Sequence, residues 1–325
     1  MAILVTGAAG FIGASVSRAL MARGEEVVGL DNLNSYYPIS LKRARLSFLL
    51  REPGFRFVEG DITDGAMLHA EFASESVSGV IHLAAQAGVR YSIENPFSYN
   101  SANLTGHLSI LEFVRRRNDN IHLVYASSSS VYGANSKTPF SETDRVDSPV
   151  SFYGATKKSN EIMSESYARL YGIRQTGLRF FTVYGPWGRP DMAYWTFTEK
   201  MLRGEPIQIF NHGNMGRDFT YIDDIVSGVI AAFDNPPKES SCPHEIYNLG
   251  NDKPEALMTM ISILESELGV TAKKEFKGMQ SGDVERTWAD ITKARTVLGF
   301  SPTVSLADGL SEFVAWRKSL PQQYQ

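Results

Sequence analysis

The feature that most constrains the fold of this chain is a glycine-rich turn between two apolar segments. Residues 3–6 are mainly apolar and lead directly into the turn at 7–13, where glycine recurs at every third position. Apolar residues then recur at helical spacing, and a second apolar run ends on Asp31. A strand, a glycine turn, a helix and a second strand that ends in an acid are typical of a unit that binds a dinucleotide.

The arrangement within this unit predicts which dinucleotide it binds. Glycines let the backbone approach a pyrophosphate closely, and the free N–H groups at the start of the following helix attract its negative charge. Asp31 ends the second strand, where a carboxylate accepts hydrogen bonds from a ribose diol and repels a phosphate. We therefore predict NAD rather than NADP as the cofactor.

Strands and helices continue to alternate through the first 180 residues or so. This alternation predicts an α/β fold with a doubly wound parallel sheet of the Rossmann type, whose ligands bind at the carboxyl ends of the strands. A later segment is expected to return to the sheet as its seventh strand. The further expected strands are 55–61, 79–84, 121–126, 175–180 and 245–250, and the expected helices are 103–117 and 153–171, the latter ended by Gly172.

Beyond residue 181 the alternation breaks at a loop rich in Gly and Pro, 182–190. The segments that follow are expected to build a smaller, mostly C-terminal α/β domain for the substrate. We predict a cofactor domain of 1–181 plus about 216–252, and a substrate domain of about 182–215 plus 253–325. The substrate domain is expected to contain the helices 197–203, 257–268 and 306–316 and the strand 207–210. The expected helix 225–233 returns to the cofactor domain.

Composition argues against several classes of function. The 325 residues carry a net charge of −4 with acids and bases interspersed, so neither nucleic acid nor a membrane surface is an expected partner. Cys242 is the single cysteine, which predicts no internal disulfide and a reducing, cytoplasmic location. The six histidines show no spacing typical of metal ligands, so we predict no metal site. His82 lies in an apolar strand and is expected to be a core residue.

Tyr153 and Lys157 are the candidate catalytic pair. They stand four positions apart, so in a helix they share one face. A tyrosine loses its proton near pH ~10, and a neighbouring ammonium lowers that pKa. A shift to about 7 requires roughly 4 kcal/mol, more than we expect from Lys157 alone, so a cationic cofactor is a natural second source. The alternative is a surface helix that carries the two residues by chance.

Four motifs together resemble the extended short-chain dehydrogenase/reductases, and among them the nucleotide-sugar epimerases, over essentially the whole chain. They are Thr6–Gly13, the serine-rich strand end before Val131–Gly133, Tyr153–Lys157 and Arg217–Tyr221. The fourteen residues Arg179–Met192 are further similar to the UDP-glucuronate 4-epimerases. This similarity is specific because the fourteen positions are consecutive.

The resemblance implies a reaction and the roles of individual residues. In this family NAD stays bound through the cycle, Tyr153 is the base and acid, Ser128 is the catalytic serine and Lys157 holds the nicotinamide ribose. A proton leaves the 4-hydroxyl of UDP-glucuronate while a hydride leaves C4, and return of the hydride to the other face of the 4-keto sugar gives UDP-galacturonate. The expected cofactor-binding residues lie in the glycine turn, at strand ends and on two helices: Gly7, Gly10, Phe11, Ile12, Gly13, Asp31, Asn32, Asp61, Ile62, Leu83, Ala84, Ala85, Asn103, Tyr153, Lys157 and Phe180.

The resemblance also implies how the sugar is held. The 4-keto-uronic acid is a β-keto acid prone to losing CO₂, so an epimerase must restrain its carboxylate. We expect Arg189 to pair with that carboxylate bidentately, with Thr182 and Ser130 adding hydrogen bonds. The full set expected at the UDP-sugar contains hydroxyl, arginine and aspartate side chains: Arg90, Ser128, Ser129, Ser130, Thr182, Arg189, Arg217, Asp283 and Arg286.

Two positions distinguish this family from its relatives. Decarboxylases and dehydratases of the superfamily carry an acid where Ser130 stands, and UDP-galactose epimerases act on a neutral group that does not call for Arg189. UDP-glucuronate decarboxylase and UDP-glucose/galactose 4-epimerase remain the alternative enzymes, and a non-catalytic nucleotide sensor is the third interpretation. The family resemblance also implies a homodimer formed through the helix that carries Tyr153.

Overall fold

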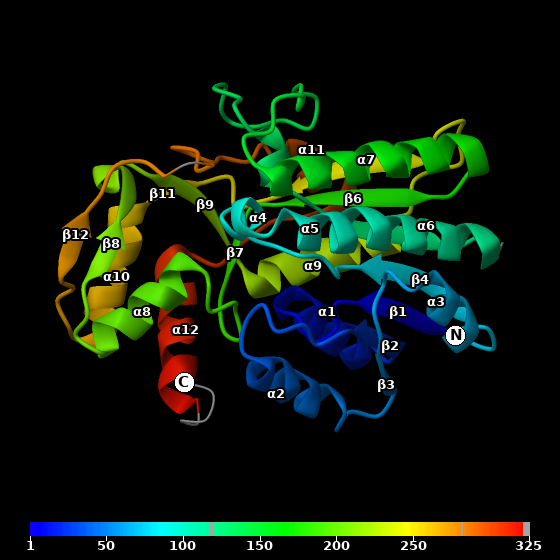
Figure 1. Ribbon diagram of the computed structural model, residues 1–325, viewed down its shortest axis with the longest axis horizontal. Helices are drawn as coiled ribbons and strands as arrows, with labels where there is room; N and C mark the ends of the chain where they lie inside the picture. The colour runs from blue at the N-terminus through cyan, green and yellow to red at the C-terminus, as the bar shows by residue number, and fades with distance from the viewer. Residues whose placement is uncertain (118–119, 281, 321–325) are drawn as a thin grey trace.

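A seven-stranded parallel sheet forms the centre of the molecule (Figure 1). The computed structural model describes residues 1–117, 120–280 and 282–320. The strand order is β10-β6-β5-β4-β1-β2-β3, and each neighbouring pair runs parallel. This order confirms the doubly wound α/β fold and the expected seventh strand. The strands are β1 (Ala2–Thr6), β2 (Glu26–Asp31), β3 (Phe55–Glu59), β4 (Val77–His82), β5 (His122–Ser128), β6 (Gln175–Phe180) and β10 (His244–Leu249).

Helices cover both faces of this sheet, because its strands are apolar on both sides. One layer joins α1, α2, α9 and α11, and the other joins α3, α6 and α7. Both layers therefore shield the faces of the sheet, and the carboxyl ends of the strands are where sheets of this type bind ligands. The bounds are α1 (Phe11–Ala22), α2 (Ile39–Leu49), α3 (Gly65–Glu71), α6 (Gly106–Arg117), α7 (Phe152–Tyr171), α9 (Ile222–Asp234) and α11 (Thr292–Leu298).

A smaller lobe lies beside the carboxyl ends of the strands, on the left in Figure 1. It contains a three-stranded sheet of order β11-β9-β7 and a two-stranded sheet of β12 and β8. One buried hydrophobic cluster runs from Val5 on β1 to Phe313 on α12, so the lobe shares its core with the central sheet. The elements are β7 (Thr182–Tyr184), α8 (Ala193–Leu202), β8 (Ile207–Ile209), β9 (Gly216–Tyr221), β11 (Pro254–Ala256), α10 (Leu257–Leu268), β12 (Lys274–Phe276) and α12 (Leu306–Ser319).

The helix α7 forms where its sequence predicts it. The Ser151 side chain caps its start by accepting a hydrogen bond from the Gly154 N–H at 3.0 Å. Gly172 ends it with a left-handed φ of 67°, as expected. The helix expected from residue 103 differs, because α6 begins only at Gly106 and follows a π-helix, Asn100–Thr105. Two short helices, α4 (Tyr91–Glu94) and α5 (Pro96–Tyr99), precede that π-helix.

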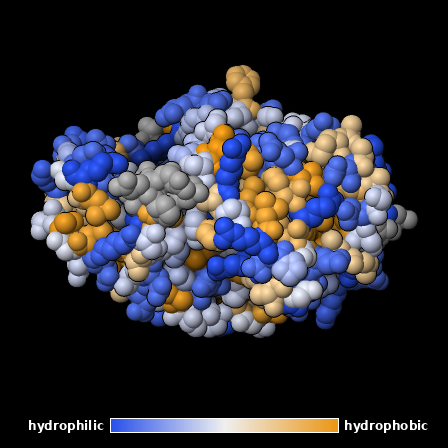
Figure 2. Space-filling view, turned by 90° about the horizontal axis from the view of Figure 1, so that it is seen from below, coloured by the Kyte–Doolittle hydropathy of each residue, from blue (hydrophilic) through white to orange (hydrophobic). Residues whose placement is uncertain are grey.

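Among the described residues, a membrane-spanning helix, a cluster of metal ligands or a further cavity would each indicate a binding partner. No helix among them is long and apolar enough to cross a membrane. Nor do three His, Cys, Asp or Glu side chains of these residues gather in a way that holds a metal ion. Figure 2 views the side on which α2 and α12 lie and shows hydrophobic patches broken by charged side chains. A cavity of about 660 Å³ lies between α1, α2 and α12, and no residue predicted for the cofactor or the sugar lines it.

Candidate active site

Two cavities open at the carboxyl ends of the central strands and meet at one group of side chains. The first, of about 240 Å³, is lined by the glycine turn, by Asp31 and by residues at the ends of β4 and β5. The second, of about 250 Å³, lies between the end of β5, the strand β7 and residues 282–287. The two cavities therefore share part of their walls, which we call the junction. The side chains that line both cavities are Ser128, Tyr153, Phe180, Phe181, Arg189 and Met192.

All the predicted cofactor-binding residues except Asn103 line the first cavity. Asn103 is 2% exposed and lies behind the wall. Its amide accepts from the Gln86 N–H at 2.8 Å and donates to the Gln86 carbonyl at 3.0 Å and to the Thr156 hydroxyl at 3.0 Å. Asn103 is thus occupied by protein groups and fixes Gln86, which does line the cavity.

The glycine turn leaves no room for side chains. Gly7 has a φ of +72°, and a Cβ there would lie 2.7 Å from the Ala84 nitrogen. A Cβ on Gly13 would lie 2.0 Å from the Gly7 carbonyl oxygen. No side chain in the described part of the chain caps the N-terminus of α1, so its N–H groups face the cavity without a competing side-chain acceptor. This arrangement suits a pyrophosphate.

Asp31 is held in place by the protein backbone. Its carboxylate accepts from the Ala9 N–H at 3.1 Å and from the Leu33 N–H at 2.8 Å. The side chain is 8% exposed, and the Lys42 ammonium lies 4.0 Å away. These contacts fix the carboxylate at the end of β2, where the sequence predicts a ribose contact.

The three predicted catalytic side chains line the first cavity, and two of them, Tyr153 and Ser128, also line the second. Tyr153 and Lys157 share one face of α7, as expected from their spacing. The buried Lys157 ammonium donates to the Ala126 carbonyl at 2.8 Å, which ties it to β5. Ser128 is the last residue of β5, and its hydroxyl donates to the Ser130 hydroxyl at 3.2 Å.

The pKa of Tyr153 depends on other groups than the sequence suggests. Burial raises the pKa of Tyr153, while a hydrogen bond with Ser128 and the charge of Arg189 lower it. The opposing protein cation is therefore Arg189 rather than the expected Lys157. Lys157 turns its ammonium to the Ala126 carbonyl, and burial lowers its own pKa to about 8.

A buried ion pair holds the helix that carries Tyr153 and Lys157 against the central sheet. Glu161, on the same helix as Tyr153, accepts from Arg179 on β6 through two hydrogen bonds of 2.8 and 2.9 Å. Both side chains are 2% exposed. Glu161 also accepts from the Ser127 hydroxyl at 2.7 Å, one residue before Ser128. The pair thus holds α7 against β6, and the Ser127 hydrogen bond holds it against the end of β5.

Most of the residues predicted for the sugar line the second cavity. They are Ser128, Ser129, Ser130, Thr182, Arg189, Arg217 and Asp283. Two main-chain carbonyls hold Arg217 Nη1 at 2.8 and 3.2 Å. The structure does not bring Arg90 and Arg286 to the wall. Arg90 pairs with Asp283 at 3.1 Å, and Arg286 is exposed beside Gly216.

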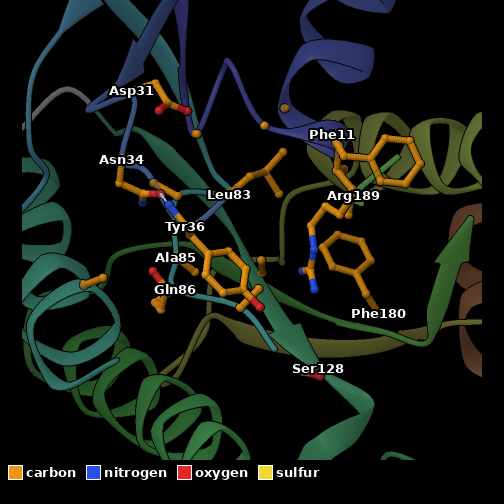
Figure 3. Close-up of a pocket in the computed structure, with 18 of the residues that line it drawn as sticks. Phe11, Asp31, Asn34, Tyr36, Leu83, Ala85, Gln86, Ser128, Phe180 and Arg189 are labelled. Carbon is orange, nitrogen blue, oxygen red and sulfur yellow. Dashed lines mark hydrogen bonds between the residues drawn. The ribbon is translucent and has the colours of Figure 1, made fainter. Parts of the chain in front are cut away.

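Arg189 lines both cavities, but it is already paired within the protein. Its guanidinium donates to both oxygens of Asp191, at 3.0 and 2.7 Å. A sugar carboxylate paired as predicted would therefore meet the part of the guanidinium that Asp191 leaves open. Burial alone would lower the pKa of Arg189, but Asp191 raises it, so the guanidinium keeps its charge. Figure 3 shows Arg189 pointing into the cavity near Phe180.

Sequence reasoning missed the segment that follows Asp31. Asn34, Tyr36, Tyr37 and Lys42 all line the first cavity, and Figure 3 shows Tyr36 extending toward Arg189. The signal available was the pair of tyrosines directly after the strand that ends in an acid. The other lining residues not foreseen are Gly60, Gln86, Ala87, Ala102, Ala126, Ser127, Phe181, Val183 and Met192.

Arg45 holds the loop that carries Arg189. This buried arginine donates to the Trp187 carbonyl at 3.0 and 2.6 Å and to the Gly188 carbonyl at 2.8 Å. It also donates to the Ala9 carbonyl in the glycine turn at 3.0 Å. One side chain therefore joins the cofactor cavity to the Arg189 loop, where Trp187 has a positive φ of 61°.

Comparison with known proteins places this arrangement in a family. Residues 3–250 match the model of the NAD dependent epimerase/dehydratase family. UDP-glucuronate 4-epimerase 1 of Arabidopsis thaliana is 50% identical over 328 residues, which cover 97% of this chain and 76% of that protein.

Solved structures agree with the sequence comparison. The UDP-glucuronic acid 4-epimerase from Bacillus cereus, in complex with UDP-glucuronic acid and NAD, has a TM-score of 0.89 and 38% identity over 98% of this chain and 99% of that one. A UDP-glucose 4-epimerase from Thermotoga maritima with UDP-glucose has a TM-score of 0.87 and 34% identity over 98% and 99% of the two chains. The chain therefore belongs to the NAD dependent epimerase/dehydratase family, and within it to the UDP-glucuronate 4-epimerases.

Proposed function

We propose that the protein is an NAD-dependent UDP-glucuronate 4-epimerase that forms UDP-galacturonate through a transient 4-keto sugar. The observation that carries this proposal is the junction of two cavities at Tyr153 and Ser128, with Arg189 beside them. A phenol and a hydroxyl suit proton transfer at a carbinol, and an arginine suits a carboxylate. The family and its solved relatives support the same activity.

The first cavity fits NAD, which supplies a hydride acceptor for C4 and later the same hydride for its other face. The tight glycine turn and the uncapped start of α1 receive the pyrophosphate. Asp31, fixed by two main-chain N–H groups, accepts from a ribose diol. Lys157 is anchored on β5 by one hydrogen bond and uses its remaining N–H groups to orient the nicotinamide ribose.

At the junction, Tyr153 takes the proton of the sugar 4-OH and returns it after the sugar has turned. Ser128 hydrogen-bonds the same oxygen and holds it in line. General base catalysis of this kind contributes typically about 10²–10⁴-fold to the rate. Because the second cavity lies directly against Tyr153, the sugar can present either face of C4 without leaving the site.

The carboxylate of the sugar meets Arg189, with Ser130 and Thr182 at the same wall. A held carboxylate keeps the 4-keto-uronic acid from losing CO₂. The decarboxylase alternative requires an acid where Ser130 stands, and Ser130 instead accepts a hydrogen bond from Ser128 at 3.2 Å. The UDP-glucose/galactose epimerase alternative offers no sugar carboxylate to the part of the Arg189 guanidinium that Asp191 leaves open.

One incubation tests the proposal. Purified enzyme receives UDP-glucuronate without added NAD, and the products are followed by NMR. We expect UDP-galacturonate to appear. UDP-xylose with CO₂ would identify a decarboxylase, turnover of UDP-glucose in preference to UDP-glucuronate would identify the neutral-sugar epimerase, and no turnover at all would favour a nucleotide sensor.

The role of Tyr153 is tested by Tyr153→Phe. We expect kcat to fall by roughly 10²–10⁴-fold because the variant keeps the ring and loses the proton acceptor. Tyr171→Phe is the matched control, since Tyr171 ends the same helix and is 50% exposed. A Tyr153→Phe enzyme with the turnover of Tyr171→Phe would contradict the assignment.

We further propose how the chain divides into two domains, where the protein is located and that it forms a homodimer. Residues 1–181 with about 216–252 serve NAD, and about 182–215 with 253–325 serve the UDP-sugar. The lone Cys242 favours a cytoplasmic location. Apolar side chains exposed on α6 and α7 support a homodimer, and Ile162→Glu should then give a monomer in sedimentation velocity. Those side chains are Leu108, Ile162, Leu170 and Tyr171.

A further inference from the structure

Arg189 does not act alone, because Asp191 holds one edge of its guanidinium. Nε donates to Asp191 Oδ1 at 3.0 Å and Nη2 donates to Oδ2 at 2.7 Å, which makes two parallel hydrogen bonds. Nη2 also meets the weak sulfur acceptor of Met192 at 3.8 Å. Within the described part of the chain, no group accepts a hydrogen bond from Nη1. The Nη1 end is therefore free for a ligand.

Asp191 is held in turn by Tyr36. The Tyr36 hydroxyl donates to Asp191 Oδ2 at 3.1 Å. Tyr36 belongs to the loop after β2, and its ring packs on Tyr91 with centroids 4.9 Å apart. Figure 3 shows Tyr36 and Arg189 pointing toward the same part of the first cavity. The chain of contacts thus begins in the cofactor cavity and ends at the sugar cavity.

The charges in this chain of contacts are fixed by the surroundings. Burial pushes the pKa of Asp191 upward, but the charge and hydrogen bonds of Arg189 bring it below its ordinary value. Burial, and then the charge of Asp191, raise the pKa of Tyr36, so the phenol keeps its proton and donates. The Arg189–Asp191 pair is net neutral. It therefore recognises a carboxylate through directed N–H groups rather than through excess positive charge.

On the basis of the epimerase activity proposed above, we propose that Asp191 is a positioning residue that fixes Arg189 for the sugar carboxylate, with Tyr36 holding Asp191. A guanidinium held along one edge has less side-chain freedom to lose when the carboxylate binds its other end. The preference for a uronate over a neutral sugar then depends on where Nη1 points. Asp191 itself does not contact the sugar in this assignment.

Positioning of the carboxylate has a chemical consequence. In the 4-keto-uronic acid, loss of CO₂ breaks the C5–C6 bond, and the electron pair moves through C5 to the C4 oxygen as an enolate. A proton then adds at C5. A carboxylate that Arg189 holds firmly stays bonded to C5, whereas a loosely held carboxylate is lost as CO₂ more often. The ratio of CO₂ to UDP-galacturonate therefore reports how well Arg189 is positioned.

The test compares Asp191→Asn with Asp147→Asn. Asp147 is a matched control because it also pairs with an arginine two positions earlier, Arg145, at 2.8 and 3.1 Å. That pair is exposed and lines neither cavity. Each enzyme with its cofactor receives UDP-glucuronate labelled with ¹³C at C6, and labelled CO₂ and UDP-galacturonate are measured together. Their ratio does not depend on the fraction of enzyme that is folded.

We expect Asp191→Asn to lower kcat/KM for UDP-glucuronate at least 10-fold and to raise the CO₂ ratio at least 10-fold. Tyr36→Phe should move both values in the same direction by less, and Asp147→Asn should match the wild type. A CO₂ ratio and kcat/KM for Asp191→Asn equal to those of Asp147→Asn would overturn the proposal. Tighter binding of UDP-glucuronate by Asp191→Asn would also overturn it, because Asp191 would then act only as a counter-charge.

Two further outcomes are separated by controls. If Asp191→Asn gives no product, the affinities of the variant for UDP-glucuronate and for UDP are measured by titration. Loss of affinity for the uronate alone supports the proposal, and equal loss for both contradicts it. If the wild type itself makes no UDP-galacturonate, the proposed function fails instead.

Discussion

At the scale of single residues, the Ser128 hydroxyl influences how easily Tyr153 loses its proton. Burial raises the pKa of Tyr153, and the hydrogen bond with Ser128 lowers it. A base works only when deprotonated, so its rate falls as the pH drops below its pKa. We expect Ser128→Ala to raise that pKa and to move the acid limb of the kcat profile to higher pH.

The control for this prediction is Ser159→Ala, on the same helix as Tyr153. Among the described residues, the Ser159 hydroxyl bonds only to the Ala155 carbonyl within α7, at 2.9 Å. Its profile should overlay that of the wild type. Coincident acid limbs for Ser128→Ala and Ser159→Ala would show that Ser128 does not tune Tyr153.

At the scale of elements, the helix α7 depends on the buried pair of Glu161 and Arg179. Removing one partner of such a pair leaves an uncompensated buried charge, which costs about 3–5 kcal/mol of unfolding free energy. We expect this loss for Glu161→Gln in denaturant titrations. Glu165→Gln is the matched control on the same helix, because Glu165 pairs with the exposed Arg169. Such a surface pair contributes at most about 1 kcal/mol. Equal losses for the two variants would contradict the account.

The elements also show what the sequence can predict. The helix at 257–268 was predicted with the bounds that α10 has, and the seventh strand lies within a residue of its expected place. Both follow regular apolar patterns. The helix α2 was not predicted, because its buried face carries Lys42 and Arg45 as well as apolar residues, which breaks the apolar pattern.

In the candidate site too, some features can be predicted from the sequence and others cannot. Motifs with local spacing, such as the glycine turn and the pair on α7, could be located from the sequence alone. The contact between Tyr36 and Asp191 joins residues 155 positions apart, so no local sequence pattern predicts it. Arg189, which the sequence predicts to bind the sugar, lines both cavities, while the Asp191 side chain that holds it was not foreseen.

At the scale of the whole molecule, buried histidines make stability depend on pH. Burial lowers the pKa of His82 to about 3 and the pKa values of His122 and His244 to about 4. The unfolded chain takes up these protons near pH ~6.5, so stability is fullest above that pH and falls between about 6.5 and 4. His82 is 4% exposed and hydrogen-bonds Thr6 at 2.7 Å, which agrees with its expected place in the core.

Each of these histidines should cost about 2 kcal/mol of unfolding free energy at pH 5. Asp218 opposes them in part, because burial raises its pKa to about 6 and its stabilising effect grows as the pH falls through that value. Denaturant titrations at pH 7.5 and pH 5 measure the sum, and we expect a lower unfolding free energy at pH 5. An equal or higher value at pH 5 would contradict this prediction.

The whole molecule joins a cofactor cavity and a sugar cavity at Tyr153, Ser128 and Arg189. In the proposed reaction, hydride leaves C4 and returns to C4 within one site, and the sugar keeps its carboxylate. The most direct measurement supplies UDP-glucuronate deuterated at C4, without added NAD, and examines the product by NMR and mass spectrometry. We predict UDP-galacturonate that retains deuterium at C4 and carbon at C6; loss of the deuterium to solvent, or of C6 as CO₂, would contradict the account.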